Sequence, residues 1–343
     1  MLDLSPIVAG SSAGQALQNT LDLARRADAL GYTRYWLAEH HNTPSIASSS
    51  PEIVIGHVAS VTRSLRVGSG GVMLPNHSPL KVAESFRVLE ALHPGRIDLG
   101  IGRAPGTDRL TALALRRSPE ALGAYDFPEQ LHELLGYLHD DLEPEHPFHR
   151  VVASPVGVPP PELWLLGSSD YGGAVAAELG LGFAFAHHIN PAPALETMLA
   201  YRARFRPSRH RAGPHAILTL AVICAETDQR AEELASSLEV AWVGLAAGRP
   251  TPLPSVEEAL RYPWTPSEEL QRQTNRRRRV VGSPARVRAA IDRLAEATAA
   301  DEVMVTTMVH DHAARVRSYE LLAESFGLRP APGWPSGAAS SGR

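Results

Sequence analysis

The chain has 343 residues, of which 44% are hydrophobic and 20% charged, and its formal net charge is -4 at pH 7. This composition is typical of a globular protein with a sizeable core, and the charge provides no basic field that would attract nucleic acid or an anionic membrane. The single cysteine, Cys224, excludes an intramolecular disulfide and a multi-cysteine metal site. Because the N-terminus lacks the order of a signal peptide and no apolar run reaches about 18 residues, we expect a soluble cytoplasmic protein.

Short apolar runs alternate with helical periodicities along the chain. Ser12 begins the first helix in a predicted capping box, and Gly31 ends it. Pro51 and Pro79 each follow a serine and mark the starts of the next two helices. A later helix is predicted over 127–139, and the next three are predicted to end near residues 179, 205 and 242. Another helix is predicted to begin at 284, and the last is predicted over 313–326. The predicted strands are 2–9, 33–38, 66–74, 96–101, 163–166, 183–186, 216–225 and 302–309.

Eight strands that alternate with helices predict a parallel α/β fold, and eight is the number that closes a (β/α)8 TIM barrel. The segment 244–282, rich in proline and poor in apolar periodicity, is expected as an insertion between strands 7 and 8. We predict one domain over 1–328 and a disordered tail over 329–343, which consists of Pro, Gly, Ala and Ser with few other residues. A doubly wound open sheet is the alternative, but residues 9–12 lack the glycine spacing of its phosphate loop.

Polar and glycine-rich clusters lie at or close to the carboxyl ends of five of the predicted strands. The carboxyl ends of the strands in a (β/α)8 barrel meet at one mouth, where catalysis takes place. We therefore expect these clusters to come together in an active site. They are Glu39-His40-His41, Gly70-Gly71 with Asn76-His77, Gly102-Arg103, Ser168-Ser169 and His187-His188.

The glycine-rich start of the helix after strand five suits a phosphate. Ser168 and Ser169 offer hydroxyl groups, and Gly172 and Gly173 offer amides near the positive end of the helix dipole. Serine at this position is otherwise a simple helix cap. Arg103 would supply the countercharge, unless it forms a surface salt bridge.

The glycine pair and the histidines each leave alternatives open. Gly70-Gly71 within a strand indicates either a β-bulge or the close approach of something flat. Neighbouring histidines on an extended strand point to opposite sides, so that each pair offers one ligand to a shared centre, and we do not expect a metal. The arginine run 276–279 is interpreted as a solvated helix start or loop, or as part of a basic lid near the phosphate.

Three stretches carry a family resemblance: Trp-Leu-Ala-Glu-His-His at 36–41, Arg-Val-Gly-Ser-Gly-Gly-Val-Met-Leu-Pro at 66–75, and Gly-Arg-Ile-Asp-Leu-Gly-Ile-Gly-Arg at 95–103. With these stretches in this order, the chain from residue 2 to 327 resembles the bacterial-luciferase-like, flavin-dependent monooxygenases. The resemblance implies a (β/α)8 barrel with a mobile insertion, a homodimer, and FMN that a separate flavin reductase supplies in its reduced form.

The resemblance also implies roles for individual residues. His40 matches the catalytic histidine of the family, and Gly70-Gly71 matches a non-prolyl cis peptide packed on the isoalloxazine ring, where the missing Cβ atoms would ease the approach of the ring. Arg103 and Ser169 match contacts to the phosphate. The other expected cofactor-binding residues are Ser168, Gly172, Gly173, His187 and His188.

The implied activity is a monooxygenase that uses reduced FMN and O2 to oxygenate a small organic substrate, with His40 as general acid and base. The walls of the substrate pocket are expected from the irregular segments 105–125 and 244–282. A deazaflavin-dependent dehydrogenase is an alternative enzyme, because related barrels use that cofactor in the same mouth. A flavin-binding protein without catalytic activity is the alternative from another class.

Overall fold

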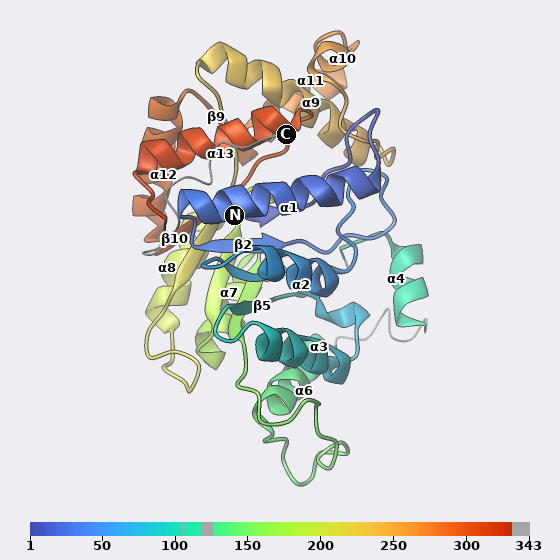
Figure 1. Ribbon diagram of the computed structural model, residues 1–343, viewed down its shortest axis with the longest axis vertical. Helices are drawn as coiled ribbons and strands as arrows, with labels where there is room; N and C mark the ends of the chain where they lie inside the picture. Colours follow the sequence, from blue (N-terminus) through green and yellow to red (C-terminus); the bar gives the residue numbers. More distant parts are fainter. Residues whose placement is uncertain (105, 118–125, 331–343) are drawn as a thin grey trace.

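The computed structural model describes residues 1–104, 106–117 and 126–330 of the chain. Its strands form a parallel sheet in which β10 lies against β1, so the predicted (β/α)8 barrel is confirmed (Figure 1). In order around the barrel, the strands are β1 (Leu2–Asp3), β2 (Arg34–Leu37), β3 (Arg66–Ser69), β5 (Ile97–Gly102), β6 (Glu162–Gly167), β7 (Gly182–Ala186), β8 (Ala216–Cys224) and β10 (Glu302–Thr306).

Three predicted strands are shorter or interrupted, and one of them is β10, which was expected over 302–309 but ends at Thr306. The first strand was expected over 2–9, but β1 ends at Asp3, and beyond it Val8 forms only an isolated bridge with Leu253 of the insertion. The strand expected over 66–74 is divided by a cis peptide between Gly70 and Gly71 into β3 and β4 (Val72–Met73). Both pieces pair with β5, so the division leaves the barrel wall continuous.

The helices cover the outside of the sheet, and several begin and end as their caps predict. Ser12 Oγ accepts a hydrogen bond from the amide of Gln15 at 3.1 Å, and Gly31 ends α1 with a φ of 88°. The side chain of Gln15 bonds to Asn19 instead of returning to Ser12, so only half of the predicted capping box forms. Within the described residues, no helix combines the length and apolarity needed to cross a membrane. The helices outside the insertion are α1 (Ala13–Leu30), α2 (Pro51–Val61), η1 (Leu74–Asn76), α3 (Pro79–Leu92), α4 (Arg109–Arg116), α6 (Phe127–His139), α7 (Asp170–Leu179), α8 (Ala194–Arg204), α9 (Asp228–Ala246), α12 (Pro284–Thr298) and α13 (His312–Phe326).

The insertion lies between β8 and β10, the seventh and eighth strands of the barrel, and is more regular than its sequence suggests. It contains α10 (Val256–Leu260), α11 (Pro266–Asn275), a 3-10 turn η2 (Arg276–Arg278) and β9 (Arg279–Gly282), which extends the sheet beside the end of β8. Capping boxes at Ser255 and Thr265 begin the two helices. Because both helices are short and polar, their apolar periodicity is weak. Of the tail expected to be disordered, residues 331–343 lie outside the described part of the chain.

The core has one layer inside the barrel and another between the sheet and the helices. Trp36, Trp164 and Met304 pack in the barrel interior, and the rings of the two tryptophans meet edge to face at 5.6 Å. Cys224 is 1% exposed, and burial raises the pKa of its thiol to about 11.

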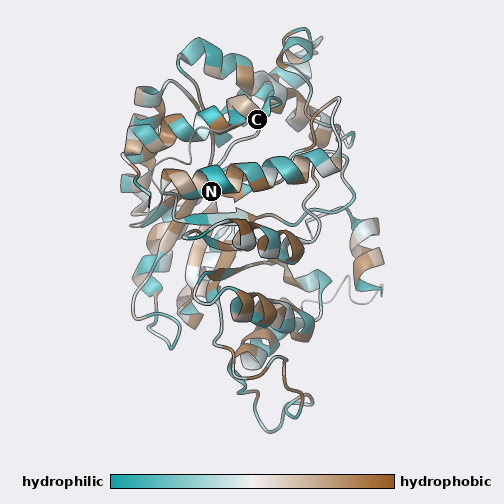
Figure 2. Cartoon of the chain, in the orientation of Figure 1, coloured by the Kyte–Doolittle hydropathy of each residue, from teal (hydrophilic) through white to brown (hydrophobic). Residues whose placement is uncertain are grey.

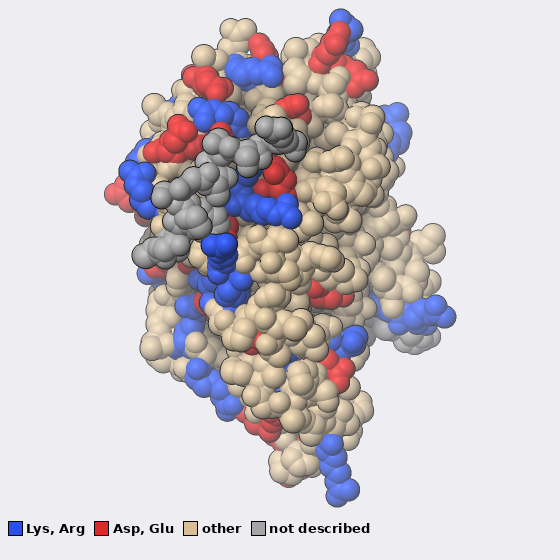
Figure 3. Space-filling model, viewed as in Figure 1, with Lys and Arg blue, Asp and Glu red and all other residues tan. Residues whose placement is uncertain are grey.

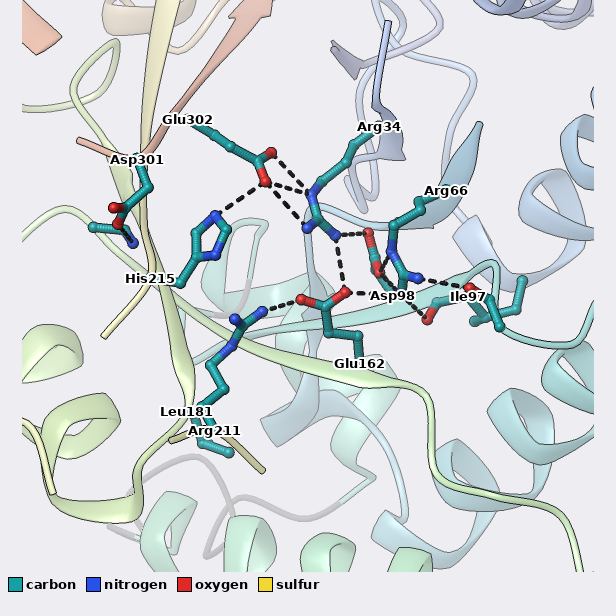
Figure 4. A network of polar contacts seen from close by, with 12 residues as sticks. Arg34, Arg66, Ile97, Asp98, Glu162, Leu181, Arg211, His215, Asp301 and Glu302 are labelled. Atoms are coloured by element: carbon teal, nitrogen blue, oxygen red, sulfur yellow. Dashed lines mark hydrogen bonds and ion pairs between the residues drawn. The ribbon is translucent and has the colours of Figure 1, made fainter. Parts of the chain in front are cut away.

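A network of charged residues closes the barrel at the amino ends of its strands (Figure 4). Arg34 lies at its centre and forms ion pairs with Asp98 at 2.8 Å and with Glu302 at 2.9 Å. Arg34 is 7% exposed and Asp98 is fully buried, so each of these charges depends on its partners. This end of the barrel therefore serves stability, and the opposite end is left for the functional site.

Candidate functional site

A cavity of about 1160 Å³ opens at the carboxyl ends of the barrel strands. Its floor is formed by residues of the barrel interior, among them Trp36, Leu166 and Met304. The insertion contributes side chains from α11 and η2 to the wall, as expected. Of the expected segment 105–125, residues 106–108 line the cavity and 109–117 do not, while 105 and 118–125 lie outside the described residues. The cavity thus occupies the place where (β/α)8 barrels carry their active sites.

Glu39, at the end of β2, is the centre of a hydrogen-bond cluster beside the cavity. Its buried carboxylate accepts hydrogen bonds from Nε2 of His41 and Nε2 of His77, both at 2.8 Å, and from the amide of Met73 at 2.9 Å. Burial would raise the pKa of Glu39, but these hydrogen bonds, that of His77 above all, hold it below its ordinary value. Glu39 therefore orients His41 and His77.

His40 points into the cavity. Its amide donates to the carbonyl of Ser48 at 3.0 Å, and its partly buried side chain lines the cavity with Nδ1 shielded from solvent and without a hydrogen-bond partner among the described residues. Burial lowers the pKa of His40, and the nearby Glu39 offsets this only in part. The imidazole is consequently neutral near pH 7 and free to exchange a proton with a bound molecule.

The second histidine pair separates into one residue inside the cavity and one outside it. His188 lines the cavity, and its Nδ1 lies 3.2 Å from the carbonyl oxygen of Thr219, which can only accept. Nδ1 of His188 therefore carries the proton, and burial lowers the pKa of the ring to about 4. His187 is 8% exposed and does not line the cavity.

Gly70 and Gly71 line the cavity, and a Cβ on either glycine would meet atoms of the neighbouring strands. A Cβ on Gly70 would lie 2.7 Å from Leu2 Cδ1, and one on Gly71 would lie 2.7 Å from the carbonyl oxygen of Gly100. Close packing against the neighbouring strands requires glycine at both positions. The expectation that glycine eases the approach of a flat ring stays a prediction.

The start of α7 and the end of β5 give the cavity a region suited to an anion. Ser168, Ser169 and Gly172 line this region, and Ser169 occupies the N-cap without using its hydroxyl as a cap. The guanidinium of Arg103 lies 4.1 Å from the ring centre of Tyr171, and the described residues offer it no carboxylate partner, which leaves the surface salt bridge without support. Gly173 packs toward Thr197 and does not line the cavity.

The arginine run divides between the protein interior and the cavity. Arg279 is buried against Glu239 of α9, and Arg276 reaches the same carboxylate at 3.6 Å. Arg278 lines the cavity, whereas Arg277 is exposed. The interpretation as a solvated segment is therefore wrong for Arg278 and Arg279. The sequence does not reveal this division, because the four consecutive arginines are identical in type.

No group of three or more His, Cys, Asp or Glu side chains in the described part of the chain is placed to hold a metal ion.

Comparison with known proteins identifies the family of the chain. The model of the luciferase-like monooxygenase family matches residues 1–301. The luciferase-like monooxygenase of Escherichia coli (strain K12) is 44% identical over 322 residues, which cover 94% of each chain. The N-acetyl-S-alkylcysteine monooxygenase of Bacillus subtilis (strain 168) is 36% identical over 95% of this chain and 97% of its own. The crystal structure of apo-MsnO8 is similar with a TM-score of 0.88 and 41% identity over 96% of this chain and 98% of its own. The chain belongs to the luciferase-like monooxygenase family.

Proposed function

We propose that the protein is an FMN-dependent monooxygenase that uses reduced flavin and O2 to oxygenate a small organic substrate, with His40 as general acid and base. The observation that carries this proposal is the set of residues that line one cavity. It joins a region suited to an anion, at Ser169 and Arg103, to the buried and unpartnered Nδ1 atom of His40. A flavin phosphate needs the region suited to an anion, and a reacting centre needs a group such as His40 that can exchange a proton.

The residues around the cavity fit FMN. The phosphate would be held by Ser168, Ser169 and the amide of Gly172, with Arg103 as the countercharge. The segment Gly70-Gly71 would form a wall beside the ring. When bound, reduced FMN would supply the electrons that activate O2. The contributions expected from Gly173 and His187 stay predictions.

His40 would hold or move a proton at Nδ1. Because burial lowers its pKa, the neutral ring can accept a proton from a reacting group and return it in a later step. His188 presents Nε2 to the cavity as an acceptor, since its Nδ1 proton is directed to Thr219. The apolar side chains of the wall would exclude bulk water during the reaction.

The names of two relatives support oxygen transfer. One is a luciferase-like monooxygenase, and the other is named for an N-acetyl-S-alkylcysteine substrate. We therefore include sulfur compounds among the candidate substrates, together with aldehydes, ketones and aromatic compounds. A cytoplasmic location and a separate flavin reductase as partner belong to the same proposal.

We also propose a homodimer that is formed through α2 and α3. Ile53, Val88 and Leu92 on these helices are 62%, 46% and 66% exposed. The two helices are more apolar than α1 (Figure 2), and charged side chains are sparse over them (Figure 3). Light scattering should give twice the mass of the chain, and an Ile53→Glu and Leu92→Glu double variant should give the monomer mass.

The test of the function compares cofactors and oxygen consumption. We expect the protein to bind FMN more tightly than the deazaflavin, and to consume O2 in excess of flavin autoxidation when a substrate is added to the reductase system. Preference for the deazaflavin, with hydride transfer and no O2 consumption, would favour the dehydrogenase instead. Flavin binding with no excess consumption across the substrate panel would favour a protein that stores flavin.

A further inference from the structure

The segment formed by α11 and η2 presents two different polar faces. Gln271, Asn275 and Arg278 line the cavity. They follow one another at intervals of four and three residues, which places them on one face of a helical segment. In Figure 1, α11 lies beside α9 and α10 at one end of the molecule.

The other polar face is anchored to α9. Nε of Arg272 donates to Glu239 at 2.6 Å, and Arg276 and Arg279 approach the same carboxylate. These arginines have the same spacing as the cavity-facing residues but are displaced by one position, which corresponds to a rotation of about 100°. Glu239 is 3% exposed, so its three ion pairs set the rotation of α11 and direct Arg278 into the cavity.

The cavity-facing side chains lack partners in the described part of the protein. Asn275 is 6% exposed and Arg278 is partly buried, yet neither they nor Gln271 form a side-chain hydrogen bond or an ion pair with a described residue. Asp108 is the only carboxylate among the described residues of the cavity wall, and it is engaged with the amide of Leu110 at 2.9 Å and with other groups of its own loop. The charge of Arg278 is thus left for a ligand.

This polar group lies in a wall that is otherwise apolar. Leu238, Trp242 and Leu245 of α9, which packs against α11, also line the cavity, whereas Arg103 belongs to the loop after β5. A guanidinium with two amide groups provides donors in the geometry that a carboxylate accepts. The ligand that matches this wall is an apolar molecule with an acidic group.

We propose that Gln271, Asn275 and Arg278 form a subsite for the carboxylate of the substrate, and that the substrate is an apolar organic acid. This rests on the proposed monooxygenase function and names the class of substrate that the same cavity takes.

The test uses isothermal titration calorimetry of the FMN-loaded protein with 4-phenylbutyrate and 4-phenylbutanamide, which have the same shape and differ in charge. We expect the acid to bind at least about tenfold more tightly, because charge-assisted hydrogen bonds are the stronger ones. Arg278→Gln should abolish this preference and change the affinity for FMN by less than about twofold. Arg278→Lys keeps the charge without the guanidinium geometry and should retain part of the preference. Arg277→Gln removes one positive charge from an exposed neighbouring residue and should keep the full preference for the acid.

Equal binding of acid and amide by the unaltered protein, or no binding of either, would overturn the subsite. A preference that survives in Arg278→Gln, or that Arg277→Gln also removes, would do so as well. Weaker FMN binding in Arg278→Gln would instead assign Arg278 to the flavin. FMN affinity is measured separately, and the heat of acid binding is recorded with or without flavin. A failure of the flavin function is therefore distinguishable from a failure of the subsite.

Discussion

Nε2 of His77 lies 2.8 Å from Oε1 of Glu39, and this hydrogen bond joins the end of β2 to the turn that follows β4. His41 donates to the same oxygen, and Met73 donates to the other. One buried carboxylate thus holds together the two segments that carry His40 and the Gly70-Gly71 wall. The cluster keeps the inner wall of the cavity in place before any ligand binds.

Glu39→Gln should weaken this arrangement, because the amide can accept through only one of its two atoms. Burial alone would lower the pKa of His77, but Glu39 more than offsets this and raises it. The pKa of His77, measured by NMR titration, should therefore fall in the variant. The free energy of unfolding should decrease by about 1–3 kcal/mol at pH 6. The raised pKa of His77 contributes stability that is lost as the pH rises through it, so the difference between variant and parent should shrink above that pKa. An unchanged titration of His77 would contradict the role of Glu39.

His40→Ala should remove the proton-exchanging group from the cavity. We expect turnover with saturating reduced FMN to fall by roughly 100-fold, the order of a lost general acid or base, with little change in FMN affinity. Oxygen consumption and product formation measure turnover, and fluorescence quenching of FMN measures affinity. His132→Ala on the exposed side of α6, away from the cavity lining, is the control for substitution of a histidine. Unchanged turnover in His40→Ala would exclude it as the acid and base.

Arg103→Gln tests the region suited to an anion. If Arg103 faces the flavin phosphate, the variant should bind FMN about tenfold more weakly, since one charge-assisted contact is lost. Its affinity for riboflavin, which lacks the phosphate, should not change. Arg109→Gln removes a charge from an exposed position nearby and should affect neither flavin. Equal weakening for both flavins would show that Arg103 acts on the ring or on the fold instead.

Gly71→Ala and Gly70→Ala form a pair in which the same methyl group meets different neighbours. The new Cβ of Gly71→Ala would meet a backbone oxygen of Gly100, which cannot move without displacing β5, whereas that of Gly70→Ala would meet the end of the Leu2 side chain. We expect Gly71→Ala to lose about 1–3 kcal/mol in the free energy of unfolding and Gly70→Ala to lose less. Urea denaturation measures both, and the reverse order would contradict the packing described for this wall.

Glu302 should make the charged network at the amino ends of the barrel strands sensitive to acid. Burial would raise its pKa, but hydrogen bonds from His215 and Arg34 outweigh this and lower it from 4.5 to about 2. A carboxylate whose pKa is lowered in the folded protein stabilises the fold at pH values above its ordinary pKa. This stabilisation, roughly 3 kcal/mol for Glu302, is lost as the pH falls from about 4.5 to about 2. Glu302→Gln should be less stable at pH 7 and should lose less stability over this range. Parallel pH dependences would contradict the role of Glu302.

Much of the fold was accessible from local patterns. The caps at Ser12 and Gly31 and the alternation of apolar runs depend on residues close together in the chain, so the helices and the eight barrel strands could be predicted. The short polar helices of the insertion were missed, since contacts with α9 hold them in place and such contacts leave no periodicity. The network around Arg34 was also missed, because it joins strand starts that are far apart in the sequence.

The sequence by itself determined that polar clusters follow the strands of a barrel and therefore meet at one mouth, since the carboxyl ends of parallel strands share one edge. Only the tertiary structure decided which member of each cluster faces the cavity. His188 lies inside it and His187 outside, and Arg278 enters it while Arg279 is buried against Glu239. Adjacent residues differ in direction by about half a turn on a strand and about 100° on a helix. The direction each takes is set by partners from distant segments, as Glu39 is by His77.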